Sequence, residues 1–242
     1  MMNLNKFSSY FVANWKLNGD FNFIDQFLDQ LKIPNNESKC VVICPTSIHL
    51  NYISGKKKGL YLGAQNVSQH TQGAFTGEIS IQSLCDLQVD FCIVGHSERR
   101  KIYFETDLDV NQKAHQLIDS KVIPIVCIGE TLEEKESKKT TAILAKQLDK
   151  SIPAISNSNN SLIAYEPVWA IGTGLTPTLE EIQHTHEFIK NYDTKFNNYK
   201  ILYGGSVKAS NAKEIVSLSN VDGALIGGAS LKCDEFEKII ED

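Results

Sequence analysis

Short apolar runs alternate with amphipathic stretches along the whole chain. Eight apolar runs predict β-strands, at residues 10–13, 40–44, 60–64, 91–94, 123–127, 162–165, 201–203 and 224–226. Stretches with helical spacing predict helices between them, at residues 21–31, 107–120, 140–152, 178–192 and 209–218. Near-continuous apolar strands separated by helices are typical of a parallel sheet that is covered by helices.

The number of strand and helix units favours one particular α/β architecture. Eight units in 242 residues fit a closed (β/α)8 barrel better than an open, doubly wound sheet. No Gly-x-Gly-x-x-Gly pattern follows the first strand, which argues against a dinucleotide-binding fold. Because no linker or low-complexity tract interrupts the chain, we expect one barrel domain over residues 1–242.

Composition and charge argue against nucleic acid, membrane and metal as partners of this chain. The chain is 42% hydrophobic and 22% charged, with a formal net charge of −5, and it has no basic stripe, so nucleic-acid binding is not expected. No run reaches the roughly 18 apolar residues of a membrane span, and residues 1–6 lack the apolar core of a signal peptide. The six cysteines form no metal-binding pattern with histidine, so we expect reduced, buried thiols, no metal and a cytoplasmic location.

Polar and glycine residues follow several of the predicted strands directly. In a (β/α)8 barrel the chemistry lies at the carboxyl ends of the strands, so these residues should meet on one rim. They comprise an amide, an ammonium, an imidazole, a carboxylate and two glycine-rich turns: Asn14, Lys16, His96, Glu166, Gly204-Gly205-Ser206 and Gly227-Gly228. The pattern therefore predicts an active site.

Four local features refine this prediction. The paired glycine turns let backbone N–H groups approach an anion closely, which favours phosphate binding. His96 precedes a predicted helix start, where the positive potential disfavours protonation of the imidazole. Residues 164–174 place a rigid Pro-Val-Trp after Glu166 and then a Gly-Thr-Gly tip, which indicates a hinged loop. Residues 65–80 have no helical period, and a loop of that length is usually functional or docked on a partner.

Six motifs resemble the triosephosphate isomerase family, in order, from about residue 10 to residue 236. The two most specific are Val-Gly-His-Ser-Glu-Arg-Arg at 94–100 and Ala-Tyr-Glu-Pro-Val-Trp-Ala-Ile-Gly-Thr-Gly at 164–174. The others lie at 14–19, 73–78, 203–207 and 227–231. The resemblance implies the interconversion of dihydroxyacetone phosphate and D-glyceraldehyde 3-phosphate, with no metal or organic cofactor.

The resemblance also implies roles for individual residues, and the acid–base roles follow a known example of pKa tuning. Glu166 would be the general base, and a neutral His96 would polarise the substrate carbonyl. Lys16 would supply positive charge and Asn14 a hydrogen-bond donor. The phosphate would be held by Gly172, Ser206, Gly227 and Gly228.

A mobile lid and a homodimer follow from the same resemblance. The tip of the 164–174 loop would close over the intermediate and suppress loss of phosphate. Thr76, in the long loop, would reach towards the active site of the partner subunit. Leu175 replaces a lysine that is frequent in the family, Pro177 should stiffen the second hinge, and Leu17 replaces a common methionine.

Two other classes of protein compete with this interpretation. Another sugar-phosphate barrel enzyme would need a Schiff-base lysine at the end of a core strand, as in an aldolase, or rim metal ligands, as in many epimerases. Neither is evident in the sequence. A non-enzymatic phosphate-binding scaffold would be expected to have lost Glu166, His96 or Lys16, and all three are present.

Overall fold

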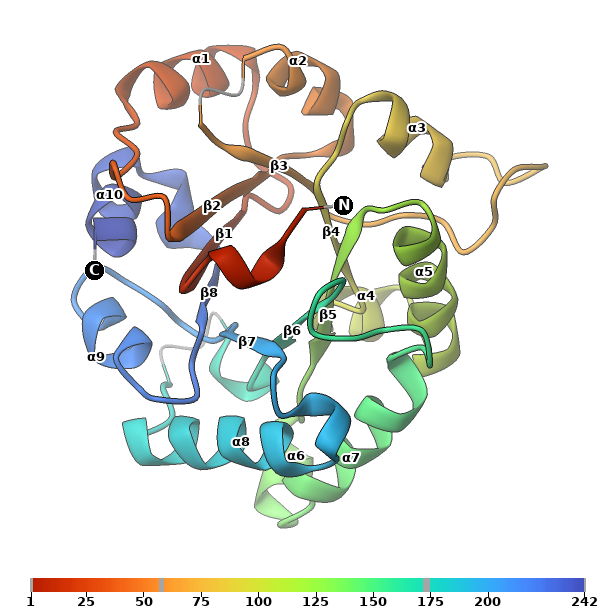
Figure 1. Cartoon of the computed structure of the whole chain (residues 1–242), viewed down its shortest axis with the longest axis vertical. Helices are drawn as coiled ribbons and strands as arrows, with labels where there is room; N and C mark the ends of the chain where they lie inside the picture. The colour runs from red at the N-terminus through yellow and green to blue at the C-terminus, as the bar shows by residue number, and fades with distance from the viewer. Residues whose placement is uncertain (1, 57–58, 172–174, 242) are drawn as a thin grey trace.

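A computed structural model describes residues 2–56, 59–171 and 175–241 and shows a closed barrel. The eight parallel strands pair in chain order, and the first also pairs with the last, with Tyr10 opposite Gly223. Helices surround the strands, as Figure 1 shows in the view along the short axis. The predicted (β/α)8 fold is therefore confirmed.

The observed strands lie within one residue of the predicted ranges at each end. They are β1 (Ser9–Asn14), β2 (Lys39–Cys44), β3 (Tyr61–Ala64), β4 (Phe91–Val94), β5 (Ile123–Ile128), β6 (Leu162–Tyr165), β7 (Lys200–Tyr203) and β8 (Gly223–Ile226). This agreement arises because the strands are buried on both faces, so each is an apolar run that ends sharply in sequence.

The longer helices also lie where the sequence predicts them. These are α1 (Phe21–Gln30), α5 (Asp107–Asp119), α7 (Thr140–Ser151) and α8 (Leu179–Asn191). The helix predicted at 209–218 is only α9 (Ala212–Val216). Further helices had no predicted range: α2 (Leu50–Ser54), α3 (Ile81–Asp86), α4 (Ser97–Ile102), α6 (Leu132–Glu136) and α10 (Cys233–Glu241). All but α10 have five or six residues, too few for an apolar stripe to repeat.

The core has two layers. One layer fills the space between the strands and the surrounding helices, and it includes Phe11, Val41 and Ile163. The other fills the barrel interior, and it includes Val12, Ile125 and Leu202. Adjacent residues of one strand therefore point into different layers. Because side chains fill the barrel interior, a site can form only at an end of the barrel.

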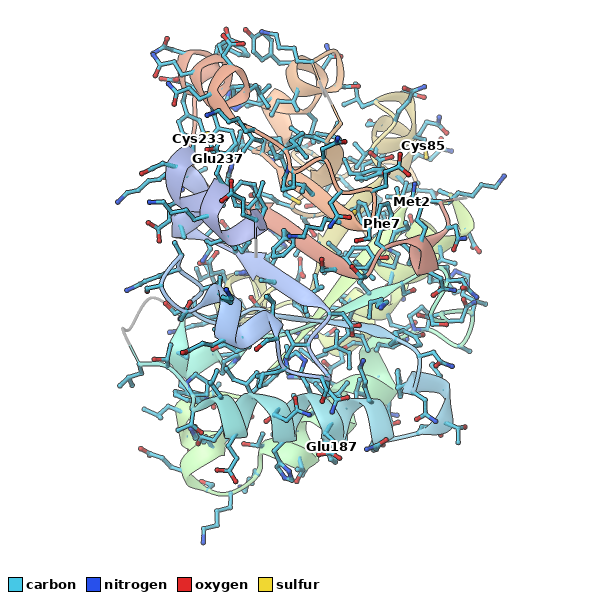
Figure 2. All side chains as sticks on the ribbon, turned by 60° about the vertical axis from the view of Figure 1, so that its left-hand side comes forward. Met2, Phe7, Cys85, Glu187, Cys233 and Glu237 are labelled. Carbon is cyan, nitrogen blue, oxygen red and sulfur yellow. The ribbon has the colours of Figure 1, made fainter. Side chains whose placement is uncertain are left out.

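The amino-terminal segment covers the opposite end of the barrel. Leu4, in a 3-10 turn (Leu4–Lys6), is fully buried in the inner layer, and its carbonyl accepts a hydrogen bond from the hydroxyl of Tyr10 at 2.5 Å. Met2 packs against the same layer, and Figure 2 shows it beside Phe7. This segment therefore closes the end of the barrel that lies away from the predicted active site.

The cysteines are all free thiols, but only four of them are buried. Cys40, Cys44, Cys92 and Cys127 have no exposed surface, whereas Cys85 on α3 and Cys233 on α10 are partly exposed. The expectation that the thiols are buried is thus wrong for two of them, and Figure 2 shows these two on separate parts of the surface. Among the described residues, no helix is long and apolar enough to cross a membrane.

Candidate active site

The residues predicted to form the site line a single cavity. It has a volume of about 640 Å³ and lies at the carboxyl ends of the strands. Its lining includes every described residue that the sequence placed on the rim: Asn14, Lys16, His96, Glu166, Gly204, Gly205, Ser206, Gly227 and Gly228. Gly172, the remaining predicted phosphate ligand, falls outside the described residues. The barrel thus brings together groups from five strands.

Glu166 directly follows β6 and is held from two sides. Its side chain is 2% exposed, and its Oε1 lies 2.9 Å from the Nε2 of His96. Its Oε2 accepts the backbone N–H of Ser97 at 2.9 Å. Burial alone raises the pKa of Glu166, but the contact with His96, the Ser97 N–H and the charge of Lys16 reverse this, so the pKa is lowered. The carboxyl group is therefore ionised and available as a base.

His96 is the N-cap of α4, as its position before a helix start predicts. The Nδ1 of its ring accepts the backbone N–H of Glu98 at 3.2 Å. In the neutral imidazole the proton must then be on Nε2, the nitrogen that faces Glu166. Burial lowers the pKa of His96, yet the carboxylate of Glu166 outweighs burial and raises it. The neutral imidazole expected during catalysis therefore stays a prediction, and it requires the carboxylate of Glu166 to move away from His96.

Lys16 and Asn14 extend from the end of β1. The Oδ1 of Asn14, a residue that lines the cavity, accepts the backbone N–H of Lys16 at 3.1 Å. This contact fixes the orientation of the amide, whose Nδ2 can only donate. The Nζ of Lys16 lies 2.6 Å from the Oε1 of Glu98. Glu98 was not singled out from the sequence, although it stands in the motif at 94–100. Its position two residues after His96 was the available signal.

Two glycines pack against Glu166 and leave no room for a side chain. A Cβ on Gly204 would lie 2.8 Å from the Cγ of Glu166, and one on Gly129 would lie 1.7 Å from its carbonyl oxygen. Gly204 belongs to the turn that is predicted to bind phosphate, and its lack of a side chain also makes room for Glu166. Gly129 had no distinguishing signal in the sequence, since only its approach to β6 in space requires a glycine there.

Glu130 is a second buried carboxylate that sequence reasoning missed. It is 1% exposed and accepts hydrogen bonds from the indole of Trp169 at 2.8 Å and the hydroxyl of Tyr165 at 3.2 Å. Burial raises the pKa of Glu130, despite the opposing effect of these donors. The ring of Trp169 also lies 3.5 Å from the Nζ of Lys135. These contacts fix the first part of the loop that follows Glu166.

Beyond residue 171, the structure describes the predicted lid loop again only from residue 175 onwards. Residues 172–174, the predicted mobile tip, lie outside the described residues. Thr178 follows Pro177 and caps α8, where its side chain accepts the N–H of Glu181 in a capping box. The chain therefore passes from the loop into a well-formed helix end directly after Pro177.

Thr76 lies in the long segment between β3 and α3, which extends from the body at the right in Figure 1. Thr76 is exposed and is not among the described residues that line the cavity. Within the segment, the rings of His70 and Phe75 stack with centroids 3.7 Å apart. Its base is bound to α5, because Asn66 accepts a hydrogen bond from Lys113 at 3.0 Å.

Cys127 lies in the barrel interior below the site. Its side chain is fully buried, and burial, together with the nearby charge of Glu166, holds the pKa of its thiol well above the usual range. Because the thiolate is the reactive form, Cys127 is a structural thiol.

Comparison with known proteins finds one family. The family model of triosephosphate isomerase matches residues 9–242. A triosephosphate isomerase of Francisella tularensis subsp. mediasiatica is 44% identical over 239 residues, covering 95% of this chain and 94% of the relative. That of Mesomycoplasma hyorhinis is 44% identical over 236 residues, covering 95% and 96%. That of Francisella philomiragia is 42% identical over 239 residues, covering 95% and 94%.

Proposed function

The chain belongs to the triosephosphate isomerase family, and from this we propose how its own residues interconvert dihydroxyacetone phosphate and D-glyceraldehyde 3-phosphate. The reaction moves one proton between two neighbouring carbons through an enediolate. The observation that best supports these roles is the contact between Glu166 and His96, which places an ionised base beside a hydrogen-bond donor in one cavity.

Glu166 is the proposed general base. It takes a proton from the carbon next to the carbonyl of dihydroxyacetone phosphate. The electron pair of that C–H bond forms a carbon–carbon double bond, and an electron pair of the C=O bond moves onto the carbonyl oxygen. With the help of His96, the proton of the neighbouring hydroxyl moves to that oxygen, and return of the first proton to the former carbonyl carbon then gives the aldehyde. The lowered pKa keeps the carboxyl ionised, and the close approach of Gly129 to its backbone and of Gly204 to its side chain holds Glu166 in place.

His96 is the proposed electrophile. In the neutral ring the proton is on Nε2, because Nδ1 accepts the N–H of Glu98, and His96 lines the cavity. When the substrate carbonyl accepts that Nε2–H, it displaces the carboxylate of Glu166 from the same donor. The exchange separates the carboxylate of Glu166 from His96. Without that nearby negative charge, which raises the pKa of His96, burial favours the neutral ring. Substrate binding therefore frees the base and prepares the imidazole in one step.

Lys16 and Asn14 are proposed to stabilise the charge that develops on the substrate oxygens. Lys16 keeps its ammonium in the cavity wall through the contact with Glu98, and Asn14 offers its amide donor. Donors that are already oriented are worth most where water is displaced. The backbone N–H groups of Ser206, Gly227 and Gly228 are proposed to bind the phosphate. Gly172 is proposed for the same task on the resemblance alone.

No metal or organic cofactor is part of this proposal, because dipoles and charges of the chain supply the stabilisation. The structure favours neither alternative enzyme class. An aldolase mechanism needs a lysine at the end of a core strand, and the described strands end in Asn14, Cys44, Ala64, Val94, Ile128, Tyr165, Tyr203 and Ile226.

We propose a homodimer in which a second copy covers the rim above β1–β4. The loops after these neighbouring strands expose large apolar side chains, with Leu17 93%, Ile48 78% and Phe104 81% exposed. The protruding segment that holds Thr76 belongs to the same part of the rim (Figure 1). Exposed apolar patches of this kind mark interfaces. A cytoplasmic location is proposed on the free state of all six cysteines.

The test is conversion of D-glyceraldehyde 3-phosphate, read through a coupled dehydrogenase with neither metal nor nucleotide given to the isomerase. Glu166→Gln keeps the shape of the side chain but removes the base, so turnover should fall by at least roughly 10²–10⁴-fold. Turnover by the Gln variant at the wild-type rate would remove Glu166 from this role. A folded but inactive wild type would instead favour a binding scaffold.

A further inference from the structure

The backbone of Lys16 has a conformation that is unfavourable for a residue with a side chain. Its φ of 51° lies in the left-handed region that favours glycine. Such a conformation persists only where surrounding contacts hold it. One contact is the N–H donated to Asn14, and another is at the carbonyl oxygen, which accepts a hydrogen bond from the Nε2 of Gln65 at 2.8 Å. The direction of the Lys16 side chain depends on both.

The amide of Gln65 uses both of its hydrogens at this point. The second is donated to the carbonyl of Cys44, the last residue of β2, at 2.9 Å. The same carbonyl accepts the backbone N–H of Trp15 at 3.1 Å. Carbonyl oxygens only accept, so both contacts require the NH₂ end of the amide and its orientation is settled. Gln65 directly follows β3 and thereby joins the ends of three neighbouring strands.

We propose that Gln65 is a positioning residue for Lys16, which it holds in the left-handed conformation that directs the ammonium into the active site. Gln65 is not among the described residues that line the cavity, so it acts through the backbone of Lys16 and not on substrate. The inference rests on the proposed role of Lys16 in binding the anionic substrate.

The position of Gln65 in the chain links the conformation of Lys16 to the long segment between β3 and α3. It is the first residue of the segment that carries Thr76, and the next residue, Asn66, is bound to Lys113 of α5. Gln69, further along, offers its carbonyl to the side chain of Gln116, also on α5. Two hydrogen bonds therefore attach the base of the segment to α5, and a displacement of that base would displace the donor that holds Lys16.

A double-mutant cycle tests the proposal. Gln65→Met keeps length and volume but removes both donors, and Lys16→Met removes the ammonium. The readout is the affinity for 2-phosphoglycolate by calorimetry, because its carboxylate resembles an enediolate. Gln65→Met should weaken binding by about 10-fold in the wild-type background and by less than about 2-fold when Lys16 is already methionine. A general loss of structure would weaken binding equally in both backgrounds.

The controls separate this proposal from the assignment of Lys16 itself. Gln183→Met removes another glutamine amide, which donates to Ser219 at 2.9 Å away from the site, and should leave the affinity unchanged. Thermal unfolding of all variants measures any shared loss of stability, which cancels in the cycle. Equal weakening in both backgrounds, or none in either, overturns the role of Gln65. If Lys16→Met alone binds like the wild type, the role proposed for Lys16 fails instead.

Discussion

The Nε2 of His96 lies 2.9 Å from the Oε1 of Glu166, and each group shifts the proton affinity of the other. The carboxylate raises the pKa of a buried imidazole that burial alone would lower, while the imidazole helps to lower the pKa of a carboxyl that burial alone would raise. The pair therefore favours a charge on both partners. A substrate oxygen that takes the Nε2–H reverses this preference.

The first prediction concerns this coupling. Glu166→Gln removes the charge but keeps the burial of His96, so the pKa of the imidazole should fall from above its ordinary value to below it. Titration of the His96 ring protons by NMR measures the shift. An unchanged His96 titration would mean that Glu166 is not the group that raises it.

The second prediction concerns stability in acid. His186 is fully buried and donates from Nδ1 to the carbonyl of Asn220 at 3.1 Å, and burial lowers its pKa to about 4. The unfolded chain, with an ordinary histidine pKa near 6.5, binds a proton between these values and the folded chain does not. Stability is therefore lost as pH falls from about 6.5 to about 4, by about 2 kcal/mol between pH 7 and pH 5.

Urea unfolding at a fixed protein concentration measures this loss. His186→Asn has no titrating ring, so its free energy of unfolding should depend less on pH over the same interval by that amount, although it is lower throughout. Equal pH dependence of the variant and the wild type would assign the acid sensitivity to other groups.

The third prediction concerns the covered end of the barrel. Leu4→Ala opens a cavity in the fully buried inner layer and should lower the free energy of unfolding by about 2–5 kcal/mol. Activity of the folded enzyme should be unchanged, because Leu4 lies at the opposite end from the cavity. Leu132→Ala, at a half-exposed side chain of α6, is the control and should cost less than about 1 kcal/mol.

The fourth prediction concerns the proposed dimer. Phe104 is 81% exposed and has a left-handed φ of 58°, which glycine adopts freely. If a second copy covers this ring, Phe104→Gly should weaken association by at least about 10-fold without destabilising the fold of the subunit. Sedimentation equilibrium over a dilution series measures the change.

Lys121 is a matched control for this experiment. It is exposed and left-handed, with φ of 64°, but it precedes β5 at the other end of the barrel. Lys121→Gly should leave association as in the wild type. If Phe104→Gly associates as strongly as Lys121→Gly, the ring does not contribute to the interface, and a wild type that remains monomeric would contradict the dimer itself.

The sequence predicted the barrel well because its strands are buried on both faces. Such strands appear as unbroken apolar runs, and their ends are marked by the polar residues and glycines of the rim. The same reasoning missed α2, α3 and α6 and gave only the start of α4, because these helices are too short to repeat an apolar stripe. It also treated all six cysteines as buried, although Cys85 and Cys233 are partly exposed.

The sequence by itself determined which chemical groups would meet, because a parallel barrel places every strand end on one rim. Asn14, Lys16, His96 and Glu166 could be named without coordinates for that reason. Only the tertiary structure decided what holds them. The contacts from Gln65 to Lys16, from Glu98 to Lys16, and of Gly129 against Glu166 join residues that follow different strands. Contacts between residues far apart in the chain arise from packing in space, so the hydrophobic pattern within one segment does not predict them.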